Sequence, residues 1–381
     1  MERMMASRVR VAFLARYLQV VNHYKLAALA SYPELDLWHI VPRQWTDGFR
    51  TYQLEVKQAK EYRIIPVNTI GQHDIHRFCY LPLDAHLREI QPDIIHIEEE
   101  PDSLAALQVA LSRRLLVPKA HLILFTWQNI LRKRGIIPEM VARITLRSAD
   151  YLIAGNSEAV KVLRQQGYEA PIQVIPQLGV ATDIYQPKRN EELRATLGLN
   201  SFVVGFVGRL VPEKGPHILL KAAARMSADV QVLLIGSGPM EERLRLQAQE
   251  EDMAERLTII ASIPHADVPK YLGIVDVIVL PSRTTPVWKE QFGHVLIEAM
   301  ACGVPVIGSS SGAIPEVIGD AGLIFPEEDV AALCECIEKV KANPDLVVRL
   351  SNAGRRRVQE CYTHQAIAEK TLQVYRTVSK L

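Results

Sequence analysis

The sequence has few cysteines and no long apolar run, and each shortage excludes a class of protein. The cysteines are Cys79, Cys302, Cys334, Cys336 and Cys361. None belongs to a C-x-x-C pair, so the spacing gives no support to a zinc site or a thioredoxin-type motif. So sparse a set is typical of a reducing cytoplasm. No run of about 18 apolar residues occurs, so no segment is expected to span a bilayer.

An excess of charge of either sign is also lacking. The chain holds 44 Lys and Arg against 43 Asp and Glu, and a net charge of +1 gives no global field that attracts nucleic acid. Residues 1–190 carry 24 basic and 19 acidic side chains and the rest carry 20 and 24, so the halves have charges of +5 and −4. The N-terminal apolar stretch contains Arg8, Arg10 and Arg16, whereas a signal peptide requires an unbroken apolar core.

Length and pattern predict an α/β protein of two domains. The 381 residues exceed a typical domain of about 100–200 residues, and 48% apolar with 23% charged residues is an ordinary globular balance. Short apolar runs alternate with helical patterns, which implies parallel sheets covered on both faces. The runs span 9–15, 35–41, 93–98, 121–127, 150–155, 172–176, 202–208, 230–236, 257–261, 275–281, 304–308 and 321–325.

These runs predict two tandem Rossmann-like, doubly wound parallel-sheet domains that face each other across a cleft. The polar stretch 178–201 lacks a strand pattern and marks the joint. We therefore expect an N-terminal domain over 1–188 and a C-terminal domain over 189–364. Ligands of open parallel sheets bind at the carboxyl ends of the strands, so functional residues should follow strands.

The first candidate site is GRLVPEKG (208–215), directly after an expected strand. Gly208 permits a tight exit from the strand, and Arg209 and Lys214 stand on a short loop that opens a helix. Two cations beside a helix N-terminus suit a phosphate or diphosphate. The alternative is a pair of ordinary solvated charges, and the position at the end of a strand favours the anion site.

The segment IGSGPMEE (235–242) resembles a dinucleotide fingerprint only in part. Glu241 stands where G-x-G-x-x-G requires its third glycine. We expect a close backbone turn there, with Pro239 as the first helical residue. The P-loop pattern G-x-x-x-x-G-K-[ST] is also absent from the sequence.

The strongest candidate is residues 281–318, which carry two glutamates eight positions apart. Glu290 lies on the loop after a strand, and Phe292 and Gly293 turn the chain into a helix that carries Glu298. The amides of residues 293–295 favour an anion over the helix. Glu298 is placed to accept hydrogen bonds from a ribose diol, and Glu290 from a sugar. The alternative of a solvated helix face plus a loop charge is less consistent with the surrounding EQFG and EAMACGVPVI.

Over roughly 202–330 the sequence resembles the donor domain of retaining glycosyltransferases of family 4, which have the GT-B fold. The shared motifs are the GRL-x-x-EKG loop, the GSGP turn and the E-x7-E element from Glu290 to Glu298. The resemblance implies that Arg209 and Lys214 neutralise the donor diphosphate, that Glu290 contacts the transferred sugar and that Glu298 binds the nucleotide ribose. The expected donor-binding residues are Gly208, Phe292, Gly293, His294, Val295 and Glu298. In enzymes of that family the last helix packs on the N-terminal domain, and the resemblance implies the same for residues 365–381.

The N-terminal half departs from that family on the acceptor side. The loop after the first strand, 15–25, has no glycine pair, and Trp127 and Gln128 stand where many members have a histidine. We list Trp127 and Gln128 as acceptor-side candidates. Glu98 and Glu99, which follow a strand, are further candidates, although a solvated charge run is the alternative.

No metal site and no cofactor are expected. The sequence has no D-x-D, and His73 and His76 form an i, i+3 pair without a third ligand, which favours a polar surface loop. Arg132, Lys133 and Arg134 form a basic cluster, for which an ordinary exposed loop is favoured over contact with anionic lipid. We expect a cytoplasmic protein, peripheral at the inner face of the membrane, without nucleic-acid partners.

The function that follows is retaining transfer of a sugar from a nucleoside diphosphate sugar to an acceptor hydroxyl, in glycan, glycolipid or polysaccharide biosynthesis. The expected acceptor is a glycan, a lipid-linked molecule or a small molecule. Two alternatives stay open: a nucleotide-sugar epimerase of the same architecture, and a non-catalytic protein that binds nucleotide sugar. No protein nucleophile is nominated.

Overall fold

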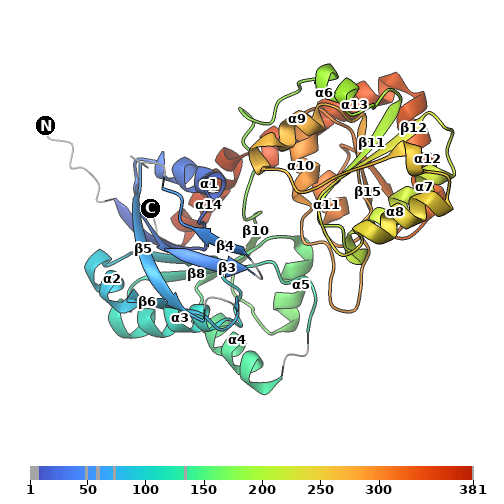
Figure 1. Cartoon of the computed structure of the whole chain (residues 1–381). Helices are drawn as coiled ribbons and strands as arrows, with labels where there is room; N and C mark the ends of the chain where they lie inside the picture. The colour runs from blue at the N-terminus through green and yellow to red at the C-terminus, as the bar shows by residue number, and fades with distance from the viewer. Residues whose placement is uncertain (1–7, 48–49, 57–60, 72–73, 133–134, 380–381) are drawn as a thin grey trace, which may run out of the picture. The chain divides into compact units, whose positions relative to one another are not determined.

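The computed structural model describes residues 8–47, 50–56, 61–71, 74–132 and 135–379. The chain forms two compact units (Figure 1). One consists of Met1–Gly179 with His364–Leu381, and the other of Val180–Thr363. The division therefore lies before the expected boundary at 188. At this division the two connecting segments pair, because the amide of Val180 donates to the carbonyl of Tyr362 at 2.9 Å.

The first unit is built on an eight-stranded sheet of order β10-β9-β8-β7-β1-β2-β5-β6, in which only β6 runs antiparallel to its neighbour. Its strands are β1 (Val9–Leu14), β2 (Leu35–Pro42), β5 (Arg63–Ile70), β6 (Cys79–Leu81), β7 (Ile94–Ile97), β8 (His121–Thr126), β9 (Tyr151–Ala154) and β10 (Ile172–Val174), with a separate hairpin of β3 (Gln44–Asp47) and β4 (Arg50–Gln53). Its helices are α1 (Val20–Ala30), α2 (Leu83–Ile90), α3 (Leu104–Leu116), α4 (Ile136–Ser148), α5 (Ser157–Gln165) and α14 (His364–Ser379).

Side chains alternate between the two faces of this sheet, as strand geometry requires. On β1, Leu14 belongs to the core that α2, α3 and α5 cover, whereas Phe13 belongs to the core that α1 and α14 cover. The last helix of the chain thus packs beside α1 and buries Leu372 and Tyr375 against the first sheet. The parallel α/β layers agree with the fold class expected from the sequence.

The sequence pattern missed β5, because Pro66 interrupts it. Proline has no N–H for a ladder and is confined to open edges. β6 pairs with β5 only from Asn68 onward, so β5 has no partner strand beside Pro66 on that side.

The second unit has six parallel strands in the order β13-β12-β11-β14-β15-β16. They are β11 (Phe202–Val207), β12 (Val230–Ile235), β13 (Leu257–Ile260), β14 (Val277–Leu280), β15 (Val306–Ser309) and β16 (Leu323–Phe325). The helices are α6 (Glu191–Thr196), α7 (Pro216–Ala224), α8 (Glu241–Glu250), α9 (Val268–Leu272), α10 (His294–Ala301), α11 (Ile314–Ile318), α12 (Val330–Ala342) and α13 (Pro344–Cys361). The strand order reverses between β11 and β14, and right-handed crossovers then place α7 and α8 opposite α10 and α11 (Figure 1).

Candidate active site

The candidate residues of the second unit lie where its strand order reverses. Such a topological switch point opens a crevice at the carboxyl ends of the strands. The loop after β11 carries Arg209 and Lys214, and the loop after β14 carries Glu290. The two loops touch through their backbones: a Cβ on Gly215 would lie 2.0 Å from the carbonyl oxygen of Pro281. Gly215 also has φ +70°, so a glycine is required there on two grounds.

Lys214 and Glu290 form an ion pair across these loops. Nζ of Lys214 lies 2.6 Å from Oε2 of Glu290, and the hydroxyl of Ser282 donates to the same oxygen at 2.8 Å. Nζ also lies 5.2 Å from the centre of the Trp288 ring, within reach of a cation–π interaction. Glu290 is buried, so these contacts hold its carboxylate in one place.

A backbone turn holds Glu290 from the other side. The amide of Ala313 donates to the Glu290 carbonyl at 3.0 Å, and a Cβ on Gly312 would lie 2.0 Å from that carbonyl oxygen. The turn at Gly312 and Ala313 therefore positions Glu290.

Arg209 differs from Lys214 in its exposure. Its side chain is 66% exposed, and its guanidinium lies 3.8 Å from Glu213. Gly208 directly follows β11, and its amide donates to the carbonyl of Ile235 at 2.9 Å. The loop thus presents one exposed and one partly buried cation.

Glu298 lies buried one turn into α10 and has three polar neighbours. Its Oε1 accepts from the hydroxyl of Tyr185 at 3.2 Å and lies 3.0 Å from Nε2 of His265 and 4.0 Å from Nε2 of His294. The hydrogen bond to Glu298 raises the pKa of His265, whereas burial lowers the pKa of His294. Tyr185 and His265 belong to no motif, and sequence reasoning missed them. The one available signal was that His265 follows β13 at the same edge of the sheet.

The start of α10 has the expected form. Gly293 precedes the helix with φ +83°, and a Cβ there would lie 2.7 Å from Leu280. The amides of Gly293, His294 and Val295 stand at this N-terminus, where a helix favours an anion. Phe292 is buried against Tyr362, with ring centres 5.6 Å apart, which anchors the turn.

The GSGP turn serves close backbone packing. A Cβ on Gly236 would lie 1.9 Å from the Gly208 oxygen, and one on Gly238 would lie 2.3 Å from the Leu210 oxygen. This agrees with the expected backbone turn. Pro239, however, is not the first helical residue, because α8 begins at Glu241.

In the first unit, Glu98 and Glu99 lie buried. The carboxylate of Glu98 accepts from the hydroxyl of Tyr17 and pairs with Nζ of Lys25, which is also buried. Glu99 pairs with Nε of Arg16 at 2.9 Å. Burial raises the pKa of Glu99. These partners favour a structural role for both residues over the predicted role in acceptor binding.

The third glutamate of that run, Glu100, holds the loop after β8. Its carboxylate accepts from the hydroxyl of Thr126 at 2.5 Å and from the amide of Trp127 at 3.0 Å. The indole of Trp127 donates to Oε1 of Gln177 at 2.9 Å. Sequence reasoning did not single out Glu100 from the run of three.

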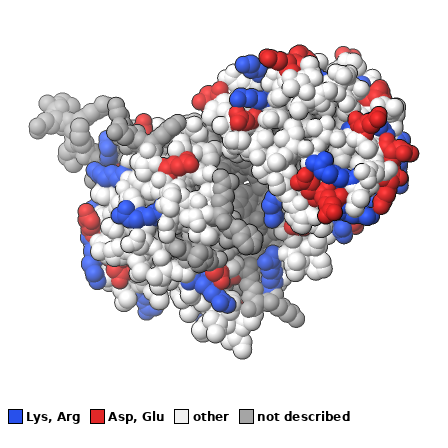
Figure 2. Space-filling model, in the orientation of Figure 1, with Lys and Arg blue, Asp and Glu red and all other residues white. Residues whose placement is uncertain are grey.

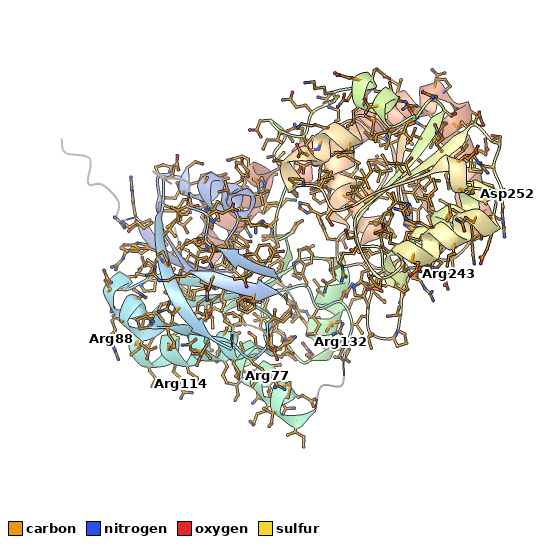
Figure 3. The ribbon with its side chains drawn as sticks, in the orientation of Figure 1. Arg77, Arg88, Arg114, Arg132, Arg243 and Asp252 are labelled. Atoms are coloured by element: carbon orange, nitrogen blue, oxygen red, sulfur yellow. The ribbon has the colours of Figure 1, made fainter. Side chains whose placement is uncertain are left out.

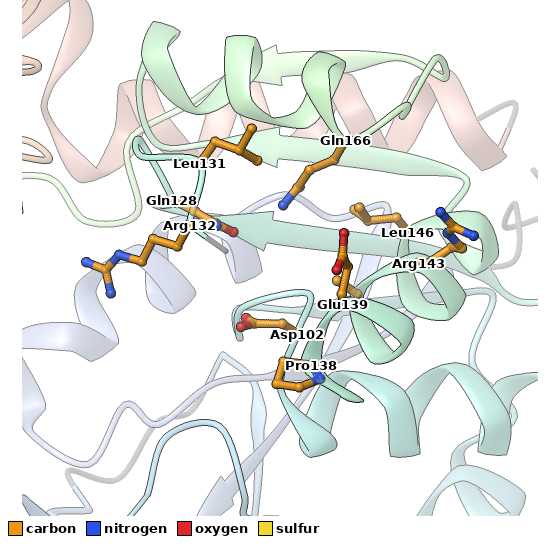
Figure 4. A pocket seen from close by; sticks show the side chains of 10 residues that line it. Asp102, Gln128, Leu131, Arg132, Pro138, Glu139, Arg143, Leu146 and Gln166 are labelled. Carbon is orange, nitrogen blue, oxygen red and sulfur yellow. The ribbon is translucent and has the colours of Figure 1, made fainter. Parts of the chain in front are cut away.

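A pocket of about 100 Å³ with polar and apolar lining residues lies at the carboxyl end of β8 (Figure 4). Its polar lining comes from Asp102, Gln128, Arg132, Glu139, Arg143 and Gln166. Gln128 is the predicted acceptor-side residue that lines it, and Figure 4 shows Glu139 of α4 between Asp102 and Gln166. The pocket suits hydroxyl-bearing ligands, because both donors and acceptors face it.

Neither a metal-ligand cluster nor a membrane-spanning helix is found among the described residues. No group of three or more His, Cys, Asp or Glu side chains lies there as metal ligands would. No helix of that same part of the chain is long and apolar enough to cross a bilayer. His73 lies outside the described residues, as do Lys133 and Arg134, while His76 lies 3.5 Å from Asp102.

The comparisons with known proteins agree with one another on the family of this chain. The family model for glycosyl transferases group 1 matches residues 189–357. Alpha-maltose-1-phosphate synthase of Mycolicibacterium smegmatis is 32% identical over 264 residues, 64% of this chain and 67% of that enzyme. A GDP-mannose-dependent alpha-(1-6)-phosphatidylinositol monomannoside mannosyltransferase of the same species is 32% identical over 199 residues, but the match spans only 50% of this chain and 52% of the enzyme.

A solved structure extends the likeness to the whole chain. Anabaena Alr3699/HepE in complex with UDP superposes with a TM-score of 0.73 at 20% identity, over 98% of this chain and 100% of that one. At this identity the match shows that both have the same GT-B fold. The chain has two Rossmann-like units, and a loop at the switch point of the second unit carries two cations. Together with these matches, this arrangement defines a retaining glycosyltransferase that uses a nucleotide-sugar donor. The chain belongs to the glycosyl transferases group 1 family, GT4.

Proposed function

We propose that the switch-point edge of the second unit binds the nucleoside diphosphate sugar. Arg209 and Lys214 bind the diphosphate, with the amides at the start of α10, while Glu290 receives the sugar and Glu298 the ribose. The observation that carries the proposal is the 2.6 Å pairing of Lys214 with Glu290, which puts the cation for the phosphate beside the carboxylate for the sugar.

The chemistry proposed is transfer with retention. The bond from the anomeric carbon to the diphosphate oxygen breaks, and a bond to the acceptor oxygen forms on the same face. The proton of the acceptor hydroxyl passes to the departing phosphate, so no protein nucleophile is required. Negative charge grows on the diphosphate as it leaves, and Arg209 and Lys214 stabilise that charge. Two cations at the diphosphate supply what a divalent metal supplies elsewhere, so the reaction is proposed to be metal-independent and without a cofactor.

We propose that the first unit binds the acceptor, through the pocket that Gln128 lines and through Trp127 beside it. Polar side chains of both hydrogen-bonding types suit a sugar or polyol hydroxyl. The mannosyltransferase relative is named for a phosphatidylinositol mannoside, which supports a lipid-linked acceptor. A cytoplasmic enzyme in peripheral contact with the membrane accords with that acceptor.

Nucleotide release from the donor tests this function. In excess EDTA, donor should yield nucleoside diphosphate only when acceptor is present. An epimerase would instead invert a sugar centre without a second substrate, and a binding protein would release nothing. A thermal-shift panel of nucleoside diphosphates identifies the donor beforehand, because the correct one stabilises the fold by about 2.7 kcal/mol at a hundredfold excess over its Kd. Loss of activity in EDTA with rescue by Mn²⁺ would contradict the metal-independent proposal.

A further inference from the structure

Helix α4 has an exposed apolar face that nothing in the first unit covers among the described residues. Ile136 is 84% exposed, Ile137 is 69% exposed and Met140 is 53% exposed, and Ile144 is exposed one turn further on. We call Ile136, Ile137, Met140 and Ile144 the α4 patch. Single exposed apolar residues are normal, but a stripe of them marks an interaction site.

The stripe follows helical spacing. Positions 136, 140 and 144 are four apart and share one side of the helix. The opposite side of α4 is buried through Val141 and Thr145, which pack into the unit. The patch therefore faces away from the core. In the view of Figure 2, the surface over α4 at the lowest part of the first unit is largely uncharged, with Lys and Arg side chains near it.

The described charge around the patch is mainly basic. Among residues 131–132 and 135–147, Arg132, Arg143 and Arg147 are basic and only Glu139 is acidic. Arg143 and Arg147 are exposed and, seven and eleven positions after Ile136, lie along the same side of α4. Figure 3 shows Arg132 and Arg114 on the side of the first unit from which α4 projects, and α3, which carries Arg114, packs against α4.

We infer that the α4 patch docks on an anionic lipid surface. Apolar side chains that enter the acyl boundary, combined with arginines that meet phosphate headgroups, are the two signals that stable peripheral binding requires. Arg143 also lines the pocket of Figure 4, so the lipid surface lies beside the proposed acceptor site.

This inference rests on the proposed membrane contact but not on the donor site. Vesicle binding needs no donor and no turnover, and Lys214→Ala, which impairs the proposed donor site, should bind vesicles as the wild type does. A failure of lipid docking and a failure of sugar transfer can therefore be told apart.

The test is co-flotation of the full chain with vesicles of phosphatidylcholine containing about 30% phosphatidylglycerol, against pure phosphatidylcholine. The wild type should float with the anionic vesicles only. Ile136→Gln with Ile137→Gln and Met140→Gln should lower the partition coefficient about tenfold or more, because the apolar anchor is removed. Arg143→Gln with Arg147→Gln should lower it too. Val348→Gln, at an exposed apolar residue of α13, is the matched control and should change nothing.

A fluorescence measurement covers the case in which the triple variant does not fold. A polarity-sensitive dye on Ile137→Cys should shift to the blue when anionic vesicles are added, and the same dye on Val348→Cys should not. Flotation of the triple variant equal to wild type, or a dye on Ile137→Cys that ignores vesicles, overturns the inference. Conversion of a dimer to a monomer by the triple variant, with vesicle binding unchanged, would assign the patch to a second copy of the chain and overturns it as well.

Discussion

Nζ of Lys214 lies 2.6 Å from Oε2 of Glu290, across 76 positions of sequence. The pair joins the loops that follow β11 and β14, on either side of the point where the strand order of the second sheet reverses. With a side-chain exposure of 18% for the lysine and 7% for the glutamate, the pair lies largely out of water. Removal of one partner would leave a buried charge uncompensated, which couples the stability of this unit to its candidate active site.

That coupling is measurable by a double-mutant cycle of Lys214→Met and Glu290→Gln. We expect a coupling free energy of unfolding of about 1–3 kcal/mol, because contacting charges in one network are not additive. The control cycle is Arg245 with Glu241, an exposed i, i+4 pair at 3.0 Å, for which about 0.3–0.5 kcal/mol is expected. Equal coupling in the two cycles would show that burial adds nothing to the Lys214–Glu290 pair.

Glu298→Ala should raise the donor KM with little change in kcat. Ribose contacts are similar in the ground and transition states, and loss of a hydrogen bond to a charged group costs about 1.5–3 kcal/mol, a rise in KM of roughly 10- to 100-fold. The helix should persist, since alanine is the best helix former. Glu335→Ala, at an exposed position of α12, is the control. Unchanged KM together with lost folding would make Glu298 a structural residue.

The pair of His265 and Glu298 should make stability depend on pH. The pKa of His265 is raised in the folded state by its hydrogen bond to Glu298, so the stabilisation is complete below the unfolded pKa of about 6.5 and is lost as pH rises through the folded value. His265→Gln should therefore cost more at about pH 5.5 than at about pH 8.5. With a side chain 47% exposed, solvent screening limits the difference to about 0.5 kcal/mol. A cost independent of pH in thermal unfolding would contradict this pairing.

Helix α14 should be indispensable to the first unit. The hydroxyl of Tyr375 lies 2.8 Å from Nδ1 of His96, and both side chains are fully buried. Tyr375→Phe leaves a buried polar atom without that bond and should lower the free energy of unfolding by about 1–3 kcal/mol. Tyr32→Phe, whose hydroxyl is bonded by Gln365 at 3.0 Å in an exposed setting, should cost far less. Equal melting temperatures for Tyr375→Phe and wild type would oppose the expectation.

Deletion of residues 365–381 should unfold the first unit. The deletion removes Ile367, Leu372 and Tyr375 from the core of the first unit, where each is at most 1% exposed. Loss of the unit's fold is the expected outcome, so lost sugar transfer in the truncated chain would not report on catalysis.

Most strands and the donor motifs could be predicted from the sequence, because each depends on residues that are close together in the chain. The apolar runs became strands of two parallel sheets, and the glycine-rich loops mark where those strands end. Strand β5 was missed because Pro66 and polar neighbours obscure its pattern, and its pairing with β2 depends on residues far away in sequence.

The partners of the site side chains could not be predicted, because they come from distant segments. The ion-pair partners of Glu98 and Glu99 are Lys25 and Arg16, which lie far away in the sequence. Without these partners in view, a run of three glutamates has the pattern of an exposed surface. Strand β13 ends and helix α10 begins at the same edge of the sheet, and this brings His265 within hydrogen-bonding distance of Glu298.

The most direct test of the donor-site assignment is kcat for Arg209→Ala. Because this side chain is 66% exposed, the melting temperature should stay unchanged. Loss of one charged contact to the departing diphosphate should raise the barrier by about 2–4 kcal/mol, a fall in kcat of roughly 30- to 1000-fold, with a smaller effect on donor KM. Arg245→Ala, at an exposed arginine of α8, should keep wild-type kcat. A near-wild-type kcat for Arg209→Ala would contradict the assignment of the β11 loop to the diphosphate.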